Sequence, residues 1–476
     1  MRLVNFCYLC TDNKAIPPNN AYLKNMKRHL LFWLLATCSL CSQTFADEII
    51  TFGGTEYVDG IAYSVSFGFY DTDEDKESRP LYAELSGIER DNSSTAISVP
   101  AEVTIKYGKN YYTIPVRGVV GMSSSIQSLS LPGSIQYIVD GAFWDCKNLA
   151  EINIPNSVSY IGSSAFAKCE SLESITLPAL VDCIAAELFV DCKKLKHVYF
   201  NGAIKYINNN AFRGCKMLTD IELPEGLMQI ASNAFYGSGL RKITIPSTLT
   251  EAFSDAFKGC DSLKYVEVNC PTCPVFQSLP SLETALLSNE VKIIAERSFF
   301  DCTKLNQIVF GDNITEIGKE AFYNCTSLTC VELNDKVTSI DLLAFYNCSK
   351  LEKIVVPRTL THIGSSAFSS CTSLKDFYCL ADQMPSIESN SFYQSNYKNA
   401  ILWVWRSLLD DYKSTSPWRF FGEIRPIDGS DDILSINNSA DTLIQRYSVD
   451  GTKNVRKKGL QILKRQNGST YKVMLK

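Results

Sequence analysis

A regular spacing of phenylalanine constrains the fold of this 476-residue chain more than any other feature. Most successive members of the series are 23 residues apart. The series is Phe143, Phe166, Phe189, Phe212, Phe235, Phe257, Phe299, Phe322, Phe345, Phe368 and Phe392. A period of this length, sustained over many copies, predicts a solenoid, because one copy can bury its apolar side only against the next copy.

Each copy repeats the same kinds of side chain at the same positions. In the copy at 149–172, two isoleucines two residues apart predict a short strand with one inward face. Pro155 ends that strand, since proline has no N–H to donate. A second inward-facing segment precedes the Phe, and Cys169 follows it by three residues. We therefore predict twelve stacked rows of short strands between Leu131 and Cys379.

One coil departs from the period. The interval from Phe257 to Phe299 is 42 residues, four short of two periods. We expect a coil here whose Phe/Cys turn is replaced by the segment 270–274, which contains Cys270 and Cys273. A C-x-x-C pair can be a local disulfide, a plain loop, a redox pair or half of a metal site. Flanking prolines and the lack of a second pair favour a local disulfide or a plain loop.

The repeat pattern resembles that of a known family. The pattern L-x-x-I-x-I-P-x-x-V-x-x-I-G-x-x-A-F-x-x-C-x-x-L, traced over 129–395, closely resembles the leucine-rich repeats of the BspA-like surface proteins. The resemblance implies a leucine-rich repeat solenoid, a right-handed superhelix of short parallel β-strands and turns. It also implies a secreted or surface-exposed protein that binds host or neighbouring-cell proteins, and it identifies no ligand.

The regions before the repeats differ in composition. Residues 27–46 have a basic start, a short apolar run and a small-residue exit, which predict a secretory signal peptide. We expect translation to start at Met26, so that 1–46 is a spurious extension plus the signal peptide. Residues 47–120 lack the period and alternate as strands do, which predicts a β-rich N-terminal cap over the first coil. The solenoid with its C-terminal cap then occupies 121–427.

Residues 428–476 form a linker followed by a small β domain with three strand-like runs. From Arg446 to Lys476 there are nine Lys or Arg residues and one Asp. The elements at 447–451 and 458–464 resemble the C-terminal sorting domain of the type IX secretion system of Bacteroidetes. That resemblance implies recognition by the secretion machinery, export through the outer membrane and a location at the bacterial cell surface. The alternative is a small β-hairpin module without a special role.

The chain has few of the residues and motifs that most catalytic sites require. The chain has three histidines and a net charge of −5, which argues against His-based sites and against a nucleic-acid partner. Phosphate loops and dinucleotide fingerprints are missing. We therefore expect no enzymatic activity, cofactor or metal. Nine cysteines share one repeat position, which predicts a ladder of reduced, packed thiols in the core: Cys146, Cys169, Cys192, Cys215, Cys260, Cys302, Cys325, Cys348 and Cys371.

The strand residues that flank the inward pair should point outward and form a platform. One predicted column contains Tyr199, Glu222, Glu267, Glu332 and Tyr378. The next contains His197, Asp220, Lys242, Tyr265 and Lys353. Tyrosines among mixed charges suit protein recognition.

We therefore predict non-covalent binding to host or microbial cell-surface and extracellular-matrix proteins. The alternatives are a glycan-binding module that stacks sugars on Tyr199, Tyr265 or Tyr378, a structural envelope component, and a thiol enzyme that uses Cys270 and Cys273.

Overall fold

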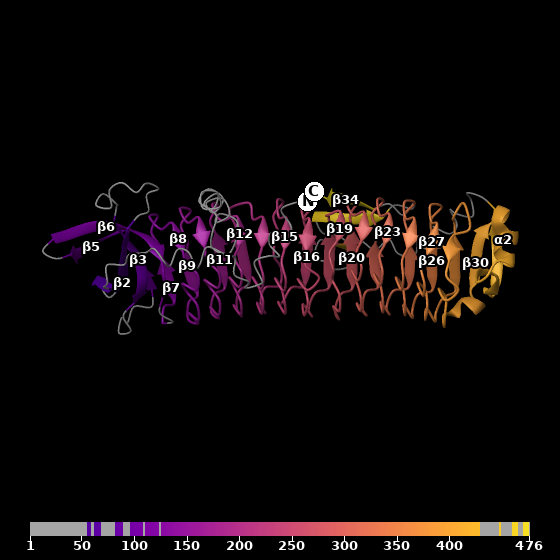
Figure 1. The fold of residues 1–476 in the computed structure, drawn as a ribbon, viewed down its shortest axis with the longest axis horizontal. Helices are drawn as coiled ribbons and strands as arrows, with labels where there is room; N and C mark the ends of the chain where they lie inside the picture. The colour runs from indigo at the N-terminus through magenta and orange to yellow at the C-terminus, as the bar shows by residue number, and fades with distance from the viewer. Residues whose placement is uncertain are drawn as a thin grey trace, which may run out of the picture. The chain divides into compact units, whose positions relative to one another are not determined.

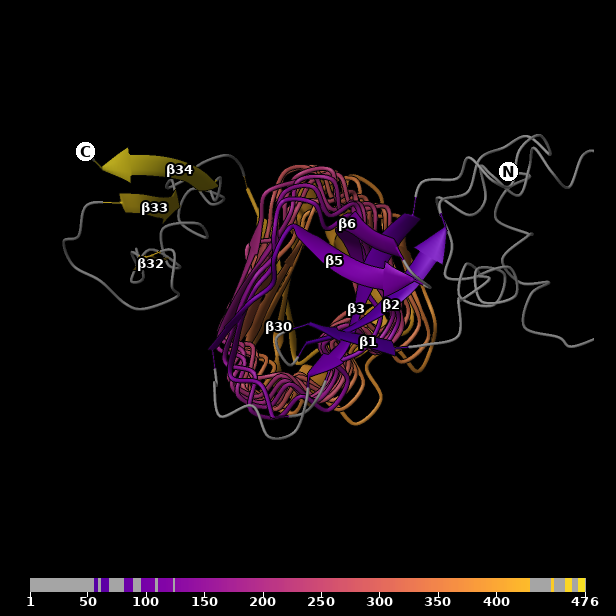
Figure 2. The same cartoon turned by 90° about the vertical axis from the view of Figure 1, so that its left-hand side faces the viewer.

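A computed structural model of the chain shows the fold in Figures 1 and 2. The residues that it describes are 55–58, 61–67, 81–88, 96–107, 110–122, 125–428, 447–448, 459–464 and 470–475. The predicted signal peptide, the start at Met26 and residues 429–433 of the predicted linker at 428–433 lie outside these residues. The predicted leucine-rich repeat solenoid is confirmed: the coils stack in chain order and superpose when they are viewed along the stack (Figure 2).

One side of the coils forms the first strand column, to which all but one of the described coils contribute a short strand. Its strands are β4 (Ala96–Ser98), β7 (Ser128–Ser130), β9 (Glu151–Asn153), β11 (Ser174–Leu177), β13 (His197–Phe200), β16 (Lys242–Ile245), β18 (Tyr265–Val268), β20 (Thr284–Leu287), β22 (Gln307–Val309), β24 (Cys330–Glu332), β26 (Lys353–Val356), β28 (Asp376–Cys379), β30 (Ile401–Trp405) and β31 (Glu423–Ile427). Neighbours within each sheet pair in parallel. The predicted row at 220–223, between β13 and β16, is not a strand.

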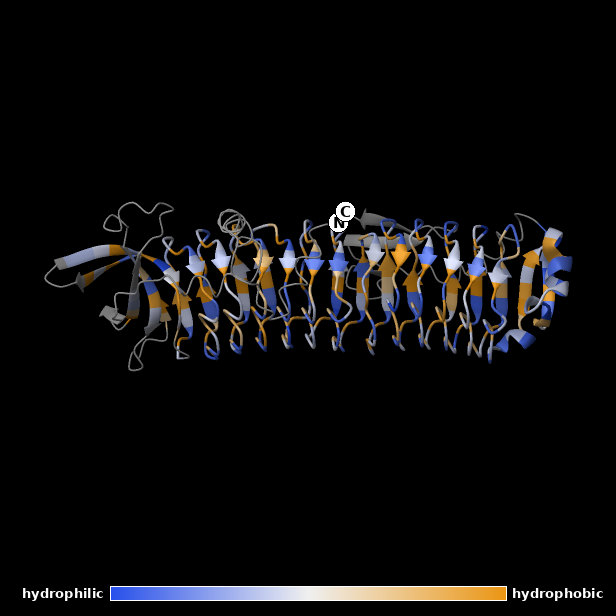
Figure 3. Cartoon of the chain, in the orientation of Figure 1, coloured by the Kyte–Doolittle hydropathy of each residue, from blue (hydrophilic) through white to orange (hydrophobic). Residues whose placement is uncertain are grey.

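A second strand column runs along another side of the coils. It consists of β6 (Asn110–Val119), β8 (Tyr137–Ile138), β10 (Tyr160–Ile161), β12 (Cys183–Ile184), β14 (Tyr206–Ile207), β15 (Gln229–Ile230), β17 (Glu251–Ala252), β19 (Thr272–Cys273), β21 (Ile293–Ile294), β23 (Glu316–Ile317), β25 (Ser339–Ile340), β27 (His362–Ile363) and β29 (Ser386–Ile387). Hydrophobic residues recur on successive strands of the stack (Figure 3). The third side is a tight turn, where the N–H of Phe322 donates to the carbonyl of Ala344 at 2.7 Å.

The repeated phenylalanines form a continuous stack inside the coils. Neighbouring ring centroids are 5.0–6.0 Å apart from Phe143 to Phe392. All nine cysteines of the predicted ladder are buried and free. The Cys325 thiol donates to the carbonyl of Phe299 in the preceding coil at 3.3 Å, and the other rungs repeat this contact. The thiol ladder therefore packs as predicted and also satisfies backbone acceptors.

The structure of the short coil between Phe257 and Phe299 shows that one prediction is wrong. Its Phe position is not lost, because Phe276 stacks between Phe257 and Phe299 at 5.0 and 6.0 Å. Cys273 lies in β19 and pairs in register with Ile294, so the segment 270–274 does not replace the turn. Cys270 and Cys273 keep the three-residue spacing of the second inward-facing segment. The four missing residues are therefore taken from the connections on both sides of it.

The two ends continue the strand columns. At the N-terminal end, β1 (Thr55–Val58), β2 (Ile61–Phe67), β3 (Leu81–Ile88) and β5 (Glu102–Tyr107) are joined to the solenoid through β6, which pairs in parallel with β8. At the other end lie η4 (Asn396–Asn399), η5 (Arg406–Leu408), α2 (Leu409–Ser414) and η6 (Trp418–Phe420). Trp418 is fully buried and packs edge-to-face on Phe377 and Phe392, so aromatic rings close the last described coil.

The C-terminal region contains three strands in an antiparallel sheet. These are β32 (Tyr447–Ser448), β33 (Gly459–Lys464) and β34 (Thr470–Leu475), paired in the order β32-β33-β34. They fall on the three strand-like runs expected from the sequence. The role of this region in sorting stays a prediction.

Candidate functional site

The outward positions of the first strand column form two aligned rows. Cα pairing places Glu332, Val355 and Tyr378 side by side in one row. Lys242 and Tyr265 neighbour each other in the second row, two residues earlier in the strands. Asp220 lies in the preceding coil, and its carboxylate is 3.9 Å from the Lys242 ammonium. Strand pairing thus aligns those platform residues that lie in strands along one face, which we call the outward face of the first strand column, whereas Glu222 lies outside any strand.

Solvent exposure varies along this face. Tyr199 is 55% exposed, and its ring lies 6.0 Å from that of His197. Tyr265 and Glu267, in contrast, are only 5% and 6% exposed. The strand alternation correctly predicts their outward positions, but it carries no information about what shields them. Burial raises the pKa of Tyr265, and its hydroxyl donates to Glu267 at 3.5 Å.

A stack of rings and cations lies on this face at the C-terminal end of the stack. The rings of Tyr378 and Trp403 are 5.5 Å apart and nearly parallel, at 6°. The Lys353 ammonium lies 5.3 Å from the Tyr378 centroid, and the Arg425 guanidinium lies 5.4 Å from that of Trp403. We call these four residues the cation–ring stack. Cation–π contacts of this kind each contribute about 0.5–1 kcal/mol at exposed sites.

Apolar side chains surround the stack on the outside of the sheet. Val355 and Ile427 are buried there, in a cluster separate from the solenoid core, and Trp405 packs against them. The Trp405 indole N–H donates to the carbonyl of Leu380 at 2.8 Å. The Trp403 indole N–H donates to Asp376 at 2.9 Å. These bonds fix both indoles, so the cluster is a preformed surface.

The cluster's charges are paired locally. Lys353 lies 3.7 Å from Glu332, and Arg425 makes two hydrogen bonds of 2.7 Å to Glu423. The hydrogen bonds from Arg425 lower the pKa of Glu423, so this pair stays ionised at neutral pH. Desolvation and then the charge of Asp376 raise the pKa of Tyr378 to about 12, so its phenol is protonated. The surface therefore combines apolar rings with neutralised charges.

Sequence reasoning found only part of this cluster. Tyr378, Lys353 and Glu332 were predicted from the repeat, whereas Trp403, Trp405 and Arg425 follow the last regular copy. A usable signal existed in the segment 401–405, where tryptophans alternate with apolar residues as in a strand with one outward face.

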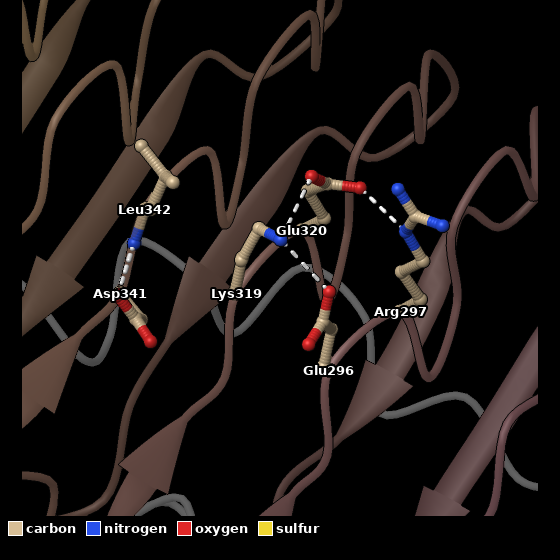
Figure 4. A network of polar contacts seen from close by, with 6 residues as sticks. All are labelled: Glu296, Arg297, Lys319, Glu320, Asp341 and Leu342. Atoms are coloured by element: carbon tan, nitrogen blue, oxygen red, sulfur yellow. Dashed lines mark hydrogen bonds and ion pairs between the residues drawn. The ribbon is translucent and has the colours of Figure 1, made fainter.

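A network of polar contacts links residues on the turn side of the coils (Figure 4). Arg297 donates to Glu320 at 2.6 Å, and Lys319 lies 3.0 Å from Glu296 and 3.7 Å from Glu320. The rings of Phe300, Tyr323 and Tyr346 stack beside this network at 4.7 and 4.8 Å. These pairs link adjacent coils, so we assign them a role in holding the turns in register.

The pair Cys270 and Cys273 has no features of a reactive site. Both are buried free thiols in the structure, so the local disulfide, which was one expected alternative, is not formed. Each thiol donates to a nearby carbonyl instead, Cys270 to Thr272 at 3.1 Å and Cys273 to Pro274 at 3.5 Å. Burial raises the pKa of Cys270 to about 11 and also raises that of Cys273, which disfavours the reactive thiolate.

Other kinds of site find little support in the described residues. His197 and His362 lie on different strand columns, in β13 and β27, and both are exposed. Among the residues that the structure describes, three or more His, Cys, Asp or Glu side chains never gather as a metal would require. Within the same residues, none of the helices has the length and apolar character to cross a membrane.

The chain is similar to several leucine-rich repeat proteins of solved structure. One is a leucine-rich repeat protein from Bacteroides ovatus, which is 23% identical, has a TM-score of 0.43 and aligns over 70% of this chain and 99% of its own. The pneumococcal vaccine antigen PcpA is 17% identical, with a TM-score of 0.41 and coverages of 79% and 99%. A leucine rich cell surface protein from Faecalibacterium prausnitzii is 22% identical, with a TM-score of 0.31 and coverages of 68% and 94%. A search of curated proteins found no match.

The repeats themselves match a family model. The model of the BspA type leucine rich repeat region matches residues 121–217, 184–273 and 272–398, which together make up more than half of the chain. These matches coincide with the stacked coils and their Phe and Cys ladders. The chain belongs to the BspA type leucine-rich repeat family.

Proposed function

We propose that the chain is a recognition protein that binds other proteins non-covalently through the outward face of its first strand column. The observation that carries the proposal is the cation–ring stack with its surrounding apolar cluster. Interfaces are enriched in Tyr, Trp and Arg, and these residues dominate binding when they lie at the centre of an interface. The stack places Tyr378, Trp403 and Arg425 together on one rigid surface.

Rigidity supports a protein-binding role. Each side chain that a partner must immobilise costs about 0.5–1.5 kcal/mol. In the stack, Trp403 is already fixed by Asp376, and Arg425 by Glu423, at 2.9 and 2.7 Å. Little additional ordering is therefore required of these side chains on binding.

Glycan binding is the second candidate, and the ring geometry confines it to one residue. Sugars stack on free ring faces, but Tyr378 has Lys353 from β26 on one side and Trp403 from β30 on the other. Tyr265 is buried. Tyr199 remains, since it is 55% exposed and, among the described residues, only His197 has its ring stacked against that of Tyr199. A structural envelope component that binds no ligand is the third possibility.

We further propose that the chain is secreted and displayed at the bacterial cell surface, in association with the outer membrane. The support is the signal-peptide pattern at 27–46 and the sorting-domain resemblance at 447–464. The partners would then be host or microbial cell-surface and extracellular-matrix proteins, and the secretion machinery would read the C-terminal segment. We propose no catalytic role and no cofactor, and the buried Cys270 and Cys273 thiols support this assignment.

A binding array tests the proposal. The full chain and the variants Trp403→Ala and Trp144→Ala would be applied to immobilised matrix and cell-surface proteins and to a glycan array. Trp144 is a matched control, because it is 53% exposed and carries a cation, Lys168, 4.8 Å from its ring, but lies on the turn side. Loss of a hot-spot residue costs at least about 2 kcal/mol, or about thirtyfold in Kd.

The outcomes separate the candidates. Protein binding that weakens in Trp403→Ala and persists in Trp144→Ala supports the proposal. Equal binding by both variants contradicts it, as does the absence of any protein ligand on the array. Binding to a glycan that is abolished by Tyr199→Ala would instead favour the second candidate.

A further inference from the structure

An arginine beside the cation–ring stack is held against a tryptophan ring. Arg358 follows β26, and its guanidinium lies 5.0 Å from the centroid of the Trp405 ring at the end of β30. The coil of β28 lies between these two residues, so the Arg358 side chain extends across it. The Trp405 indole is itself held by its hydrogen bond to the Leu380 carbonyl. The ring contact therefore restricts an arginine side chain that would otherwise rotate freely.

Arg358 differs in its charge partners from the other cations of this surface. In the part of the chain that the structure describes, its guanidinium has no hydrogen bond or ion pair, and the residue is exposed. Four other cations in or next to the strands β26, β28, β30 and β31 already have carboxylate partners. They are Lys353 with Glu332, Lys375 with Glu352, Arg406 with Asp428 and Arg425 with Glu423. An incoming anion would have to displace a carboxylate at each of those four, but not at Arg358.

We infer that Arg358 determines the charge of the ligand: the protein bound at the cation–ring stack presents a carboxylate that pairs with Arg358. This inference rests on the proposed function and adds the chemistry of the bound segment to it. A carboxylate fits because its two oxygens match two parallel N–H donors of a guanidinium. A large apolar side chain next to the acidic residue fits as well, because Trp405 packs with Val355 and Ile427.

The ring contact also separates this ligand from a glycan. Arg358 occupies one face of the Trp405 ring, so a sugar that stacked on that face would have to displace the cation. A protein carboxylate, in contrast, binds the guanidinium while the ring contact persists. The bound segment is therefore expected to have an acidic residue beside a large apolar one.

One carboxylate of the chain lies near Arg358 along the backbone. The Asp382 N–H donates to the Arg358 carbonyl at 3.1 Å, but no ion pair joins the two side chains among the described contacts. Asp382 is exposed, so its charge is screened by water. It would nevertheless repel a second carboxylate at Arg358, which makes Asp382→Asn a variant with the opposite expected effect.

Peptides selected from a random 12-residue display library on the full chain supply the probe. Each selected peptide is synthesised together with a counterpart in which Gln and Asn replace every Glu and Asp. Fluorescence polarisation then measures the Kd of both forms for the full chain and for the variants Arg358→Gln, Arg358→Lys and Trp403→Ala. Arg213→Gln is the matched control, because Arg213 is also exposed and lies 5.3 Å from the ring of Tyr236, but on the turn side.

We expect acidic residues beside apolar ones in the selected peptides, and roughly tenfold weaker binding of the neutral counterparts. Arg358→Gln should weaken the acidic peptides to the same extent and leave the neutral ones unchanged, because both changes remove one ion pair. Arg358→Lys should also bind more weakly, since an ammonium lacks the paired donors. Asp382→Asn should tighten binding by up to about fivefold. Arg213→Gln should have no effect.

The outcomes distinguish this inference from the proposed function. Peptides that need Trp403 but bind Arg358→Gln as tightly as the unmodified chain would overturn the inference and leave the proposed function intact. Equal binding of the acidic and neutral forms would do the same. If no selected peptide loses binding in Trp403→Ala, both fail. Heparin is added as a sulfated glycan: binding of heparin that requires Arg358, without such binding by acidic peptides, would show that the ligand class is wrong.

Discussion

The buried thiols should make the solenoid less stable as pH rises above about 8.5. The variant Cys325→Ala isolates the contribution of one of these thiols. Cys325 is fully buried, and desolvation raises its pKa well above the ordinary value of 9.0. The folded state therefore keeps this thiol protonated at pH 10, while the unfolded chain ionises it. Because the folded pKa is raised, the stabilisation is fully present below the unfolded pKa and is lost as pH rises above it.

The size of the effect follows from linkage. With an unfolded pKa of about 8.5, ionisation stabilises the unfolded chain at pH 10 by about 2 kcal/mol per thiol, and by almost nothing at pH 7. At pH 7, Cys325→Ala removes the hydrogen bond to the Phe299 carbonyl and leaves a small cavity, at a cost of about 1.5–2 kcal/mol. The variant should therefore be less stable than the wild-type chain at pH 7 and about as stable at pH 10.

Urea unfolding followed by circular dichroism, under reducing conditions at pH 7, 8, 9 and 10, measures this convergence. Phe322→Leu is the control, because it perturbs the same coil and has no group that titrates. Its free-energy difference from the wild-type chain should stay constant across the series. If the difference for Cys325→Ala were also constant, the thiol would ionise equally in both states, and the argument from burial would be refuted.

Three further predictions test the packing of the coils. Phe322→Ala should lower the free energy of unfolding by about 3–5 kcal/mol, as measured by urea unfolding, because it removes one ring from a continuous stack. The double variant Cys270→Val/Cys273→Ile should change stability by less than about 1.5 kcal/mol, because it restores the residue types found at these positions in other coils; the corresponding double serine variant should unfold at clearly lower urea. Gly239→Ala should destabilise the chain by at least about 1–3 kcal/mol in thermal unfolding, because the added Cβ would lie 1.9 Å from the Lys216 carbonyl oxygen.

The residues that face the core were predictable from the sequence because every coil needs apolar side chains at the same positions. A position that faces the core has to be apolar in every copy, so its period is visible without a structure. Phe276 lies 23 residues before Phe299 and occupies the same stack, but it was missed because it follows Phe257 by only 19 residues and Leu279 replaces the Cys expected three residues later. The outward direction of Tyr265 and Glu267 was predictable from strand alternation, but their low exposure was not, since alternation indicates the side of the sheet and not what packs on it.

The candidate site was harder to predict, because its outward residues do not follow the repeat that identifies the core residues. Outward positions of the first strand column have no common requirement: the row that contains Tyr378 also contains Thr244, Glu267, Leu286 and Val355. Their side chains can differ from coil to coil while the Phe and Cys ladders remain unchanged. Yet the row spacing that stacks Phe345 on Phe368 at 5.5 Å also brings Tyr378 to 5.5 Å from Trp403 on the outside. The solenoid therefore supplies the geometry of a ring stack on either surface, and the outward residues alone determine where on the face such a stack occurs and what it can bind.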